Sequence, residues 1–337
     1  MKITQTKIFA AILQQLRSVA LLVGSNAFAT LTIAAGTLFV AQIVDPAEFG
    51  KYALAAQVAM SIYPALTLRY EHALPLIGKR HVASLYLAGC LLLLFITTLT
   101  FLILGVIGLS IPILSTHVPK GVVDLFPLVA LGAFTLALGS IFQSAALARG
   151  ALTKLAIARV LRAVVLVSMQ IGLVLSLGAS ATWLLIGEVS ANLVHGAILV
   201  TTFGLGGVLA AARRPWPQFR RRIIVLGLRY KEFPLITFPH IMVHAALGLL
   251  FAAILGAVYG AAALGQYYLM RKLVFGVLAL FSLAFYQHAV AEAARVHRAK
   301  LFGVALQALV LMGGVAVVSV GVILLFGQEL FVLSVGD

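Results

Sequence analysis

Two adjacent cations, Arg271 and Lys272, lie within an apolar stretch of the sequence that runs from residue 264 to 288. Placing a charged side chain at the centre of a membrane helix costs about 2.5–3.5 kcal/mol, so such a residue usually faces a wet cavity or an acidic partner. Arginine offers a planar fork of N–H donors that matches a phosphate group, and lysine offers a point charge. The pair is therefore a candidate anion site, with snorkelling to the lipid head groups as the alternative.

Arg69 and Arg17 are two further candidates for a cationic site. Each stands where an apolar stretch meets a basic segment. Together they could attract an anionic head group toward the entrance of a membrane cavity. The alternatives are a topology anchor for both residues and, for Arg69, a local ion pair with Glu71.

Glu188, Asn192 and His195 are the polar residues of an apolar stretch from 182 to 207. Glu188 and His195 are seven residues apart, which places them on one face of a helix, with Asn192 on the intervening turn. An intramembrane carboxylate usually points into the helix bundle, so Glu188 is a candidate site for a coupling proton or sodium ion. His195 would act as the relay. A buried structural hydrogen bond is the alternative role for this group.

Pro234 and Pro239 lie at the start of the apolar stretch from 235 to 257. Proline removes a backbone donor and bends a helix, so both are hinge candidates, although proline is common in transmembrane helices generally. His240 and His244 have the i, i+4 spacing of metal ligands. Because no third ligand is near them in the sequence, we predict no metal site.

Nine apolar stretches hold these residues, and each reaches the length of about 20 residues that a membrane-spanning helix needs. They are 19–44, 52–70, 83–111, 125–148, 156–178, 182–207, 235–257, 264–288 and 303–326. Continuous apolar runs favour helices over the alternating strands of a barrel. With 63% apolar and 10% charged residues, the sequence predicts an all-α integral membrane protein, built as a polytopic helix bundle.

The distribution of lysine and arginine predicts the orientation of the chain. Of the 24 such residues, 20 fall in alternate loops, and only Lys51 and Lys120 fall in the opposite ones. Since short basic loops stay in the cytoplasm, we expect the N-terminus inside. The net charge of +15 arises at membrane-flanking positions and not in an aromatic-interleaved patch. Membrane lipids are therefore expected partners, and nucleic acid is not.

A weak internal repeat divides the chain into two lobes. Residues 47–54 share alanine, glycine, tyrosine and leucine with residues 262–269 at the same offsets, and a parallel duplication would relate the copies by an axis along the membrane normal. Six spans separate the two copies, so a second lobe should also hold six, and the three seen indicate a truncated chain. We expect four parts: a cytoplasmic amphipathic segment (1–17), a first lobe (18–210), a basic cytoplasmic linker (211–231) and an incomplete second lobe (232–337).

Several short pieces carry a family resemblance by their order and spacing. They are residues 43–52 (IVDPAEFGKY), 68–73 (LRYEHA), 229–234 (RYKEFP), 265–271 (GQYYLMR) and 325–331 (LFGQELF). With them the chain resembles the polysaccharide and O-antigen flippases (Wzx-like proteins) of the multidrug/oligosaccharidyl-lipid/polysaccharide exporter superfamily.

This resemblance implies two helical lobes around a central cavity, with about 12 to 14 spans in a full-length member. It also implies that a polyprenyl-diphosphate-linked oligosaccharide is moved across the bacterial inner membrane for polysaccharide, O-antigen or lipopolysaccharide biosynthesis. The expected partners are this lipid-linked oligosaccharide and the glycan polymerase and ligase machinery. The family also places a basic residue at the position of Arg271.

Two other classes of function remain open. A drug/cation antiporter of the same superfamily would favour acidic residues in its cavity. An intramembrane glycan polymerase or acyltransferase would carry a long outer loop with catalytic Arg or His. We predict neither an enzyme nor a cofactor, because the chain has no Gly-rich phosphate loop and no carboxylate pair with catalytic spacing.

Overall fold

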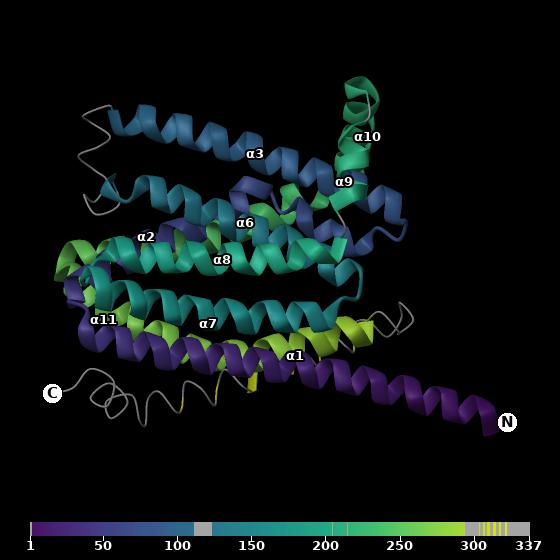
Figure 1. Ribbon diagram of the computed structural model, residues 1–337, viewed down its shortest axis with the longest axis horizontal. Helices are drawn as coiled ribbons and strands as arrows, with labels where there is room; N and C mark the ends of the chain where they lie inside the picture. The colour runs from purple at the N-terminus through teal and green to yellow at the C-terminus, as the bar shows by residue number, and fades with distance from the viewer. Residues whose placement is uncertain are drawn as a thin grey trace.

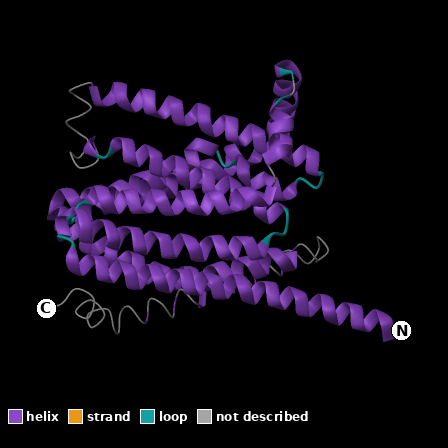
Figure 2. Ribbon diagram, in the orientation of Figure 1, coloured by secondary structure: helices purple, strands orange, loops and turns teal. Residues whose placement is uncertain are grey.

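The structure is a computed structural model that describes residues 2–110, 123–203, 205–213 and 215–293, with single residues between 303 and 321. Over these residues the chain forms helices and turns and no strand (Figure 2). In chain order the elements are α1 (Lys2–Ile43), α2 (Pro46–Thr67), the 3-10 helix η1 (Tyr70–Leu76), α3 (Arg80–Ser110), α6 (Phe126–Ala148), α7 (Leu152–Leu177), α8 (Ala181–Phe203), α9 (Leu205–Ala212), α10 (Trp216–Arg229), the π-helix η2 (Phe233–Thr237) and α11 (Phe238–Ala293).

The long helices lie side by side in a bundle, and successive turns fall at opposite ends of it (Figure 1). One end holds the N-terminus, the starts of α3 and α7, and α10. We call it the basic end, because Arg80, Lys154 and the arginines of α10 lie there. Helix α2 contacts α11, α6 and α8 and occupies the middle of the bundle. Basic and non-basic turns alternate along the sequence, and in the structure they lie at opposite ends of the bundle.

Six helical segments among the described residues are long and apolar enough to cross a membrane. They are Leu21–Ile43, Arg80–Gly108, Phe126–Ala148, Leu152–Leu177, Ala181–Thr202 and Phe233–Lys272. These segments make the chain an α-helical membrane protein. The expected count of nine spans is not confirmed, since the stretch expected at 52–70 is helix α2 but is not among the six. The stretch expected at 303–326 lies outside the continuously described ranges.

Helix α11 is two helices joined by a reversal at Gly260, the turn that the sequence places between 257 and 264. Gly260 has φ +85°, which interrupts the helical backbone. The rings of Phe251 and Tyr267 lie 5.0 Å apart, whereas 16 residues of straight helix would separate them by about 24 Å. The chain therefore folds back on itself here, and positive φ explains why glycine stands at the bend.

The two copies of the internal repeat cross each other at their equivalent glycines. A Cβ added to Gly50 would lie 1.9 Å from the carbonyl oxygen of Ala261, and one added to Gly265 would lie 2.5 Å from that of Pro46. Such close backbone approach requires glycine on both sides, as in other membrane helix contacts. Gly50 and Gly265 are the fourth residues of their copies, so the residues that align in sequence also meet in space. A two-fold axis between the two copies would produce this contact.

Two of the expected domain boundaries fall within helices. Helix α1 begins at Lys2 and continues to Ile43, so the first 17 residues extend the first span as one helix, although their side chains are not described. The expected start of the basic linker, residue 211, falls within helix α9, which ends at Ala212, and the segment 211–231 also contains helix α10. Proline at positions 215 and 217 sets the start of that helix, since proline suits its first turn.

Candidate functional site

A polar cavity of about 350 Å³ opens inside the bundle, between α1, α2, α6, α7 and α8. Its described lining has two arginines and no carboxylate. The polar lining residues are Asn26, Thr30, Tyr63, Ser140, Gln143, Arg159, Arg162, Asn192 and His195. Because a polar cavity among apolar helices is costly unless it holds water or a ligand, this cavity is the candidate functional site.

Arg159 and Arg162 come from one face of α7, three residues apart. Arg159 donates from Nη1 to Oδ1 of Asn26 on α1 at 3.3 Å. Arg162 donates from Nε to Oδ1 of Asn192 on α8 at 2.7 Å. Asparagine neutralises neither charge, so these two contacts orient the guanidinium groups and leave the cavity wall cationic.

Glu188 neutralises one of the two arginines from just beside the cavity. Its Oε1 lies 3.5 Å from Nη2 of Arg162, and its Oε2 accepts a hydrogen bond from the Tyr52 hydroxyl at 2.6 Å. Gln170 fixes Tyr52 in turn, donating from Nε2 to the Tyr52 oxygen at 3.3 Å and to the Leu184 carbonyl at 3.0 Å. Among the described contacts, the partner of Arg159 is the side-chain amide of Asn26. No carboxylate neutralises the charge of Arg159 there.

Two buried polar atoms of the lining have no hydrogen-bond partner among the described residues. They are Nδ2 of Asn192 and Nδ1 of His195. Gly139 on α6 gives the imidazole its space, because a Cβ there would lie 3.4 Å from the ring of His195. Buried polar atoms are almost always satisfied, so these two atoms carry a desolvation cost that no described contact offsets.

Arg69 lies at the basic end of the same cavity. Its Nη1 is 3.4 Å from Oε1 of the fully buried Glu71, which also accepts a hydrogen bond from the hydroxyl of the cavity residue Ser140 at 3.2 Å. The guanidinium lies 5.5 Å from the ring centre of Tyr63, a second lining residue. The positive φ values of Leu68 (48°) and Arg69 (62°) end α2 and turn Arg69 toward this cluster.

His72 belongs to this basic-end cluster and lies outside the membrane-spanning segments. Its Nε2 lies 3.6 Å from Oε1 of Glu71. Burial lowers the pKa of His72, the Glu71 carboxylate raises it and Arg69 lowers it, and the net direction is down. The imidazole is therefore mainly neutral at pH 7, and the positive charge of the cluster resides on Arg69.

Arg271 and Lys272 do not line the described cavity. Arg271 lies at the contact of α11 with α2, where its Nη1 donates to Oε1 of Gln57 at 3.0 Å. The ammonium group of Lys272 lies 5.8 Å from the ring centre of Tyr52 and 5.9 Å from that of Tyr268. Lys272 thus contacts the ring of Tyr52, whose hydroxyl binds Glu188. Arg271 links α11 to α2 through its hydrogen bond to Gln57.

The other residues singled out in the sequence fall in several places. Asn192 and His195 line the cavity, and Glu188 lies beside it. Pro234 lies in the π-helix η2 and Pro239 in the first turn of α11, so both stand at an irregular junction. The side chain of Arg17 lies outside the described part of the chain. Among the residues that the structure describes, no three His, Cys, Asp or Glu side chains gather as a metal site would require.

Arg159 and Arg162 are the site residues that sequence reasoning missed. Both were assigned to a basic loop, because they continue the run begun by Arg149 and Lys154. The available signal was that both fall inside the stretch expected to span the membrane, 156–178. A cation within a span should face a cavity or a partner, and this holds for Arg159 and Arg162 as it does for Arg271.

No protein family model, curated protein or solved structure matches this chain. The class that the fold and the cavity define is an α-helical membrane protein with a polar, cationic chamber inside its bundle.

Proposed function

We propose that the protein is a flippase that moves a polyprenyl-diphosphate-linked oligosaccharide from the inner to the outer leaflet of a bacterial inner membrane. The observation that carries the proposal is the cavity between α1, α2, α6, α7 and α8, with Arg159 and Arg162 in its wall. A cationic cavity among apolar helices suits an anionic substrate that must leave water and lipid head groups on its way across. The family resemblance of the sequence points to the same substrate class.

The substrate's diphosphate would bind at Arg159, whose charge has no carboxylate partner among the described contacts. Guanidinium binds phosphate through two parallel N–H···O bonds, which gives both strength and orientation. The glycan hydroxyls would take the neutral polar groups of the lining, including Asn192 and His195. Arg69 would meet the head group at the basic end, which we place in the cytoplasm.

Glu188 would couple the binding of an ion to movement of the bundle. It connects three helices, because Tyr52 lies on α2, Arg162 on α7 and Glu188 on α8. Protonation of the carboxylate would remove its attraction for Arg162 and free that guanidinium for the diphosphate. The rival cation antiporter is less well supported, since the described lining has no carboxylate and Glu188 is already paired with arginine.

Flipping by the purified chain in liposomes tests the function directly. The substrate is a fluorescent polyprenyl-diphosphate oligosaccharide, and its appearance in the outer leaflet is read by quenching from outside. Arg159→Gln should slow flipping about tenfold or more, because a hydrogen bond to a charged group contributes about 1.5–3 kcal/mol. Arg159→Lys should be intermediate, since lysine keeps the charge but not the fork.

Arg80→Gln is the matched control, because it removes one arginine from the basic end without touching the cavity. Unchanged flipping in Arg159→Gln, with wild-type protein incorporation, would remove the cavity as the substrate site. Uptake of a cationic dye by the wild-type liposomes, without flipping of the lipid, would support the antiporter instead.

A further inference from the structure

Helix α10 runs across the basic end of the bundle, whereas the long helices run along it (Figure 1). It extends past α3, so one side of it has no helix of the bundle beside it in this view. A helix that crosses the end of a set of membrane-spanning helices lies roughly in the plane of the membrane surface. This position of α10 is independent of the proposed transport function.

The side chains of α10 suit the boundary between lipid and water. Arg220, Arg221 and Arg222 supply its charge, while Val225 and Leu228 are 59% and 64% exposed. Only Phe219 of this helix is buried. Val225 and Leu228 follow Arg221 by four and seven residues, so these exposed apolar residues share a helix face with a cation. Such a face suits the level of the lipid head groups, where charge and hydrocarbon meet.

A groove of about 470 Å³ lies between α10 and the first turns of α3. Its cationic side is formed by Arg221 and Arg222, with His81 on α3 near them, and its apolar side includes Leu85 and Val225. One face of α10 provides both the cationic and the apolar lining of the groove, because the spacing of residues 218, 221, 222 and 225 places them on the same side of the helix. The groove thus offers phosphate donors and a hydrocarbon surface together.

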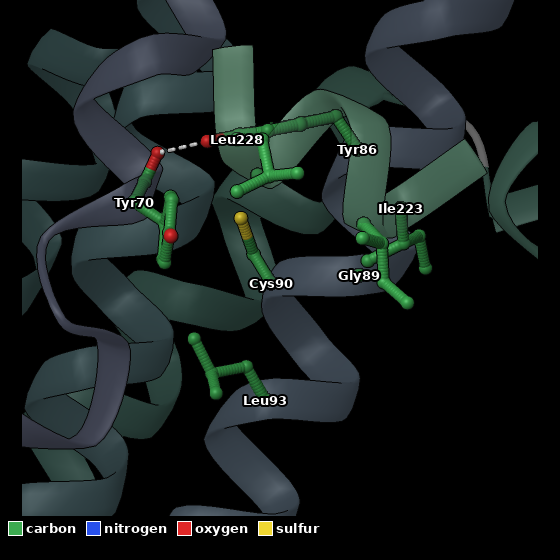
Figure 3. A pocket seen from close by; sticks show the side chains of 9 residues that line it. Tyr70, Tyr86, Gly89, Cys90, Leu93, Ile223 and Leu228 are labelled. Carbon is green, nitrogen blue, oxygen red and sulfur yellow. Dashed lines mark hydrogen bonds between the residues drawn. The ribbon is translucent and has the colours of Figure 1, made fainter. Parts of the chain in front are cut away.

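A second pocket of about 320 Å³ lies on the other side of the contact between α3 and α10, and no charged residue lines it. Figure 3 shows Tyr86 donating to the Tyr70 carbonyl oxygen on one wall, at 3.1 Å, with Cys90, Ile223 and Leu228 around the space. An anionic head group has no cationic partner among the residues that line this pocket. Charge therefore distinguishes the two flanks of α10 and selects the groove with Arg221 and Arg222.

We propose that this groove binds an anionic phospholipid of the surrounding membrane. The phosphate and head group lie against Arg221 and Arg222, and the first carbons of the acyl chains lie along Leu85 and Val225. Charge complementarity favours an anionic over a zwitterionic lipid, because each cation near such a membrane surface contributes about 1 kcal/mol to the attraction. Binding would hold α10 against the membrane beside α3.

Native mass spectrometry of the full chain in a neutral detergent tests the site with two lipids, phosphatidylglycerol and phosphatidylcholine. Wild-type protein should retain phosphatidylglycerol at least about tenfold more tightly than phosphatidylcholine. The double variant Arg221→Gln/Arg222→Gln should lose this preference. The matched control Arg213→Gln/Arg220→Gln removes the same two charges from neighbouring exposed positions outside the groove, and it should keep the preference.

Each other outcome overturns the proposal. Equal loss in both double variants means diffuse attraction to basic residues, and equal retention in both means that the groove is not the site. Competition by inorganic phosphate or by glycerophosphoglycerol as effective as that by the intact lipid means a free-anion site instead. Arg221→Lys/Arg222→Lys, which keeps the charge, should retain the preference, and wild-type elution and thermal stability of all variants exclude misfolding as the cause.

Discussion

At the scale of single residues, the cavity depends on which charges are paired. Arg162 has a carboxylate partner in Glu188, and the contact is completed by Tyr52 from another helix. Arg159 has an amide partner instead. Two arginines of the same helix face therefore differ in their partners, since Arg162 pairs with a carboxylate and Arg159 with an amide.

Glu48 carries a pH-dependent part of the stability, and it precedes the apolar stretch of α2. Its pKa is lowered by the hydrogen bond from Lys51 and then by the backbone N–H of Ala181 at the start of α8. A lowered pKa means that the ionised form stabilises the fold above the ordinary value of 4.5, and that this stability is lost as pH falls through the folded-state pKa. We therefore expect the melting temperature of the wild type to exceed that of Glu48→Gln at pH 7, and the difference to vanish in acid.

Thermal unfolding of the purified proteins from pH 7 down to about pH 3 measures this difference. Lys51→Gln serves as the partner variant, since it removes the largest cause of the shift and leaves the Ala181 contact in place. The difference between it and the wild type should also shrink in acid. A constant gap between wild type and Glu48→Gln at every pH would contradict the assignment.

At the scale of helices, the crossing of α2 and α11 is the contact most sensitive to a single methyl group. Gly50→Ala should destabilise the protein by about 1–3 kcal/mol, the usual cost of overpacking, because the new Cβ would lie 1.9 Å from a backbone oxygen. Gly172→Ala on α7 is the control, since a Cβ there meets nothing within 4 Å. Alanine should stabilise that helix by up to about 1 kcal/mol.

Melting temperatures of the two variants decide the matter. They should move in opposite directions from the wild type. A wild-type value for Gly50→Ala would mean that the helices do not approach each other closely at this point, and it would remove the spatial argument for the internal repeat.

Much of the helical arrangement could be predicted from the sequence. The stretch expected at 125–148 is helix α6, Phe126–Ala148, because the length of an apolar run and its flanking prolines and charges fix both ends. The cavity could not be predicted in the same way. Tyr52 and Glu188 are 136 residues apart, and no local pattern shows that they meet. The charge pattern counts Arg159 with the basic loop that begins at Arg149, although this residue also lies within the apolar stretch 156–178.

At the scale of the whole molecule, the separation of charge between the two ends predicts the orientation in the membrane. The basic end holds α10 and the starts of α3 and α7, and the opposite end holds the turn between α7 and α8 (Figure 1). Because short basic segments remain in the cytoplasm, the turn at Ala179 should be outside and Gln218 on α10 inside. Both residues are exposed, so a cysteine at either place is open to reagents.

Cys90 is the single cysteine, and it is buried, so Cys90→Ala provides a background for Ala179→Cys and Gln218→Cys. An impermeant maleimide added to intact cells should label Ala179→Cys, and Gln218→Cys only after the membrane is opened. Labelling of Gln218→Cys alone in intact cells would reverse the orientation. The groove of Arg221 and Arg222 would then face the outer leaflet, and the proposed path of the diphosphate would begin at the wrong end, because Arg69 lies at the same end as α10.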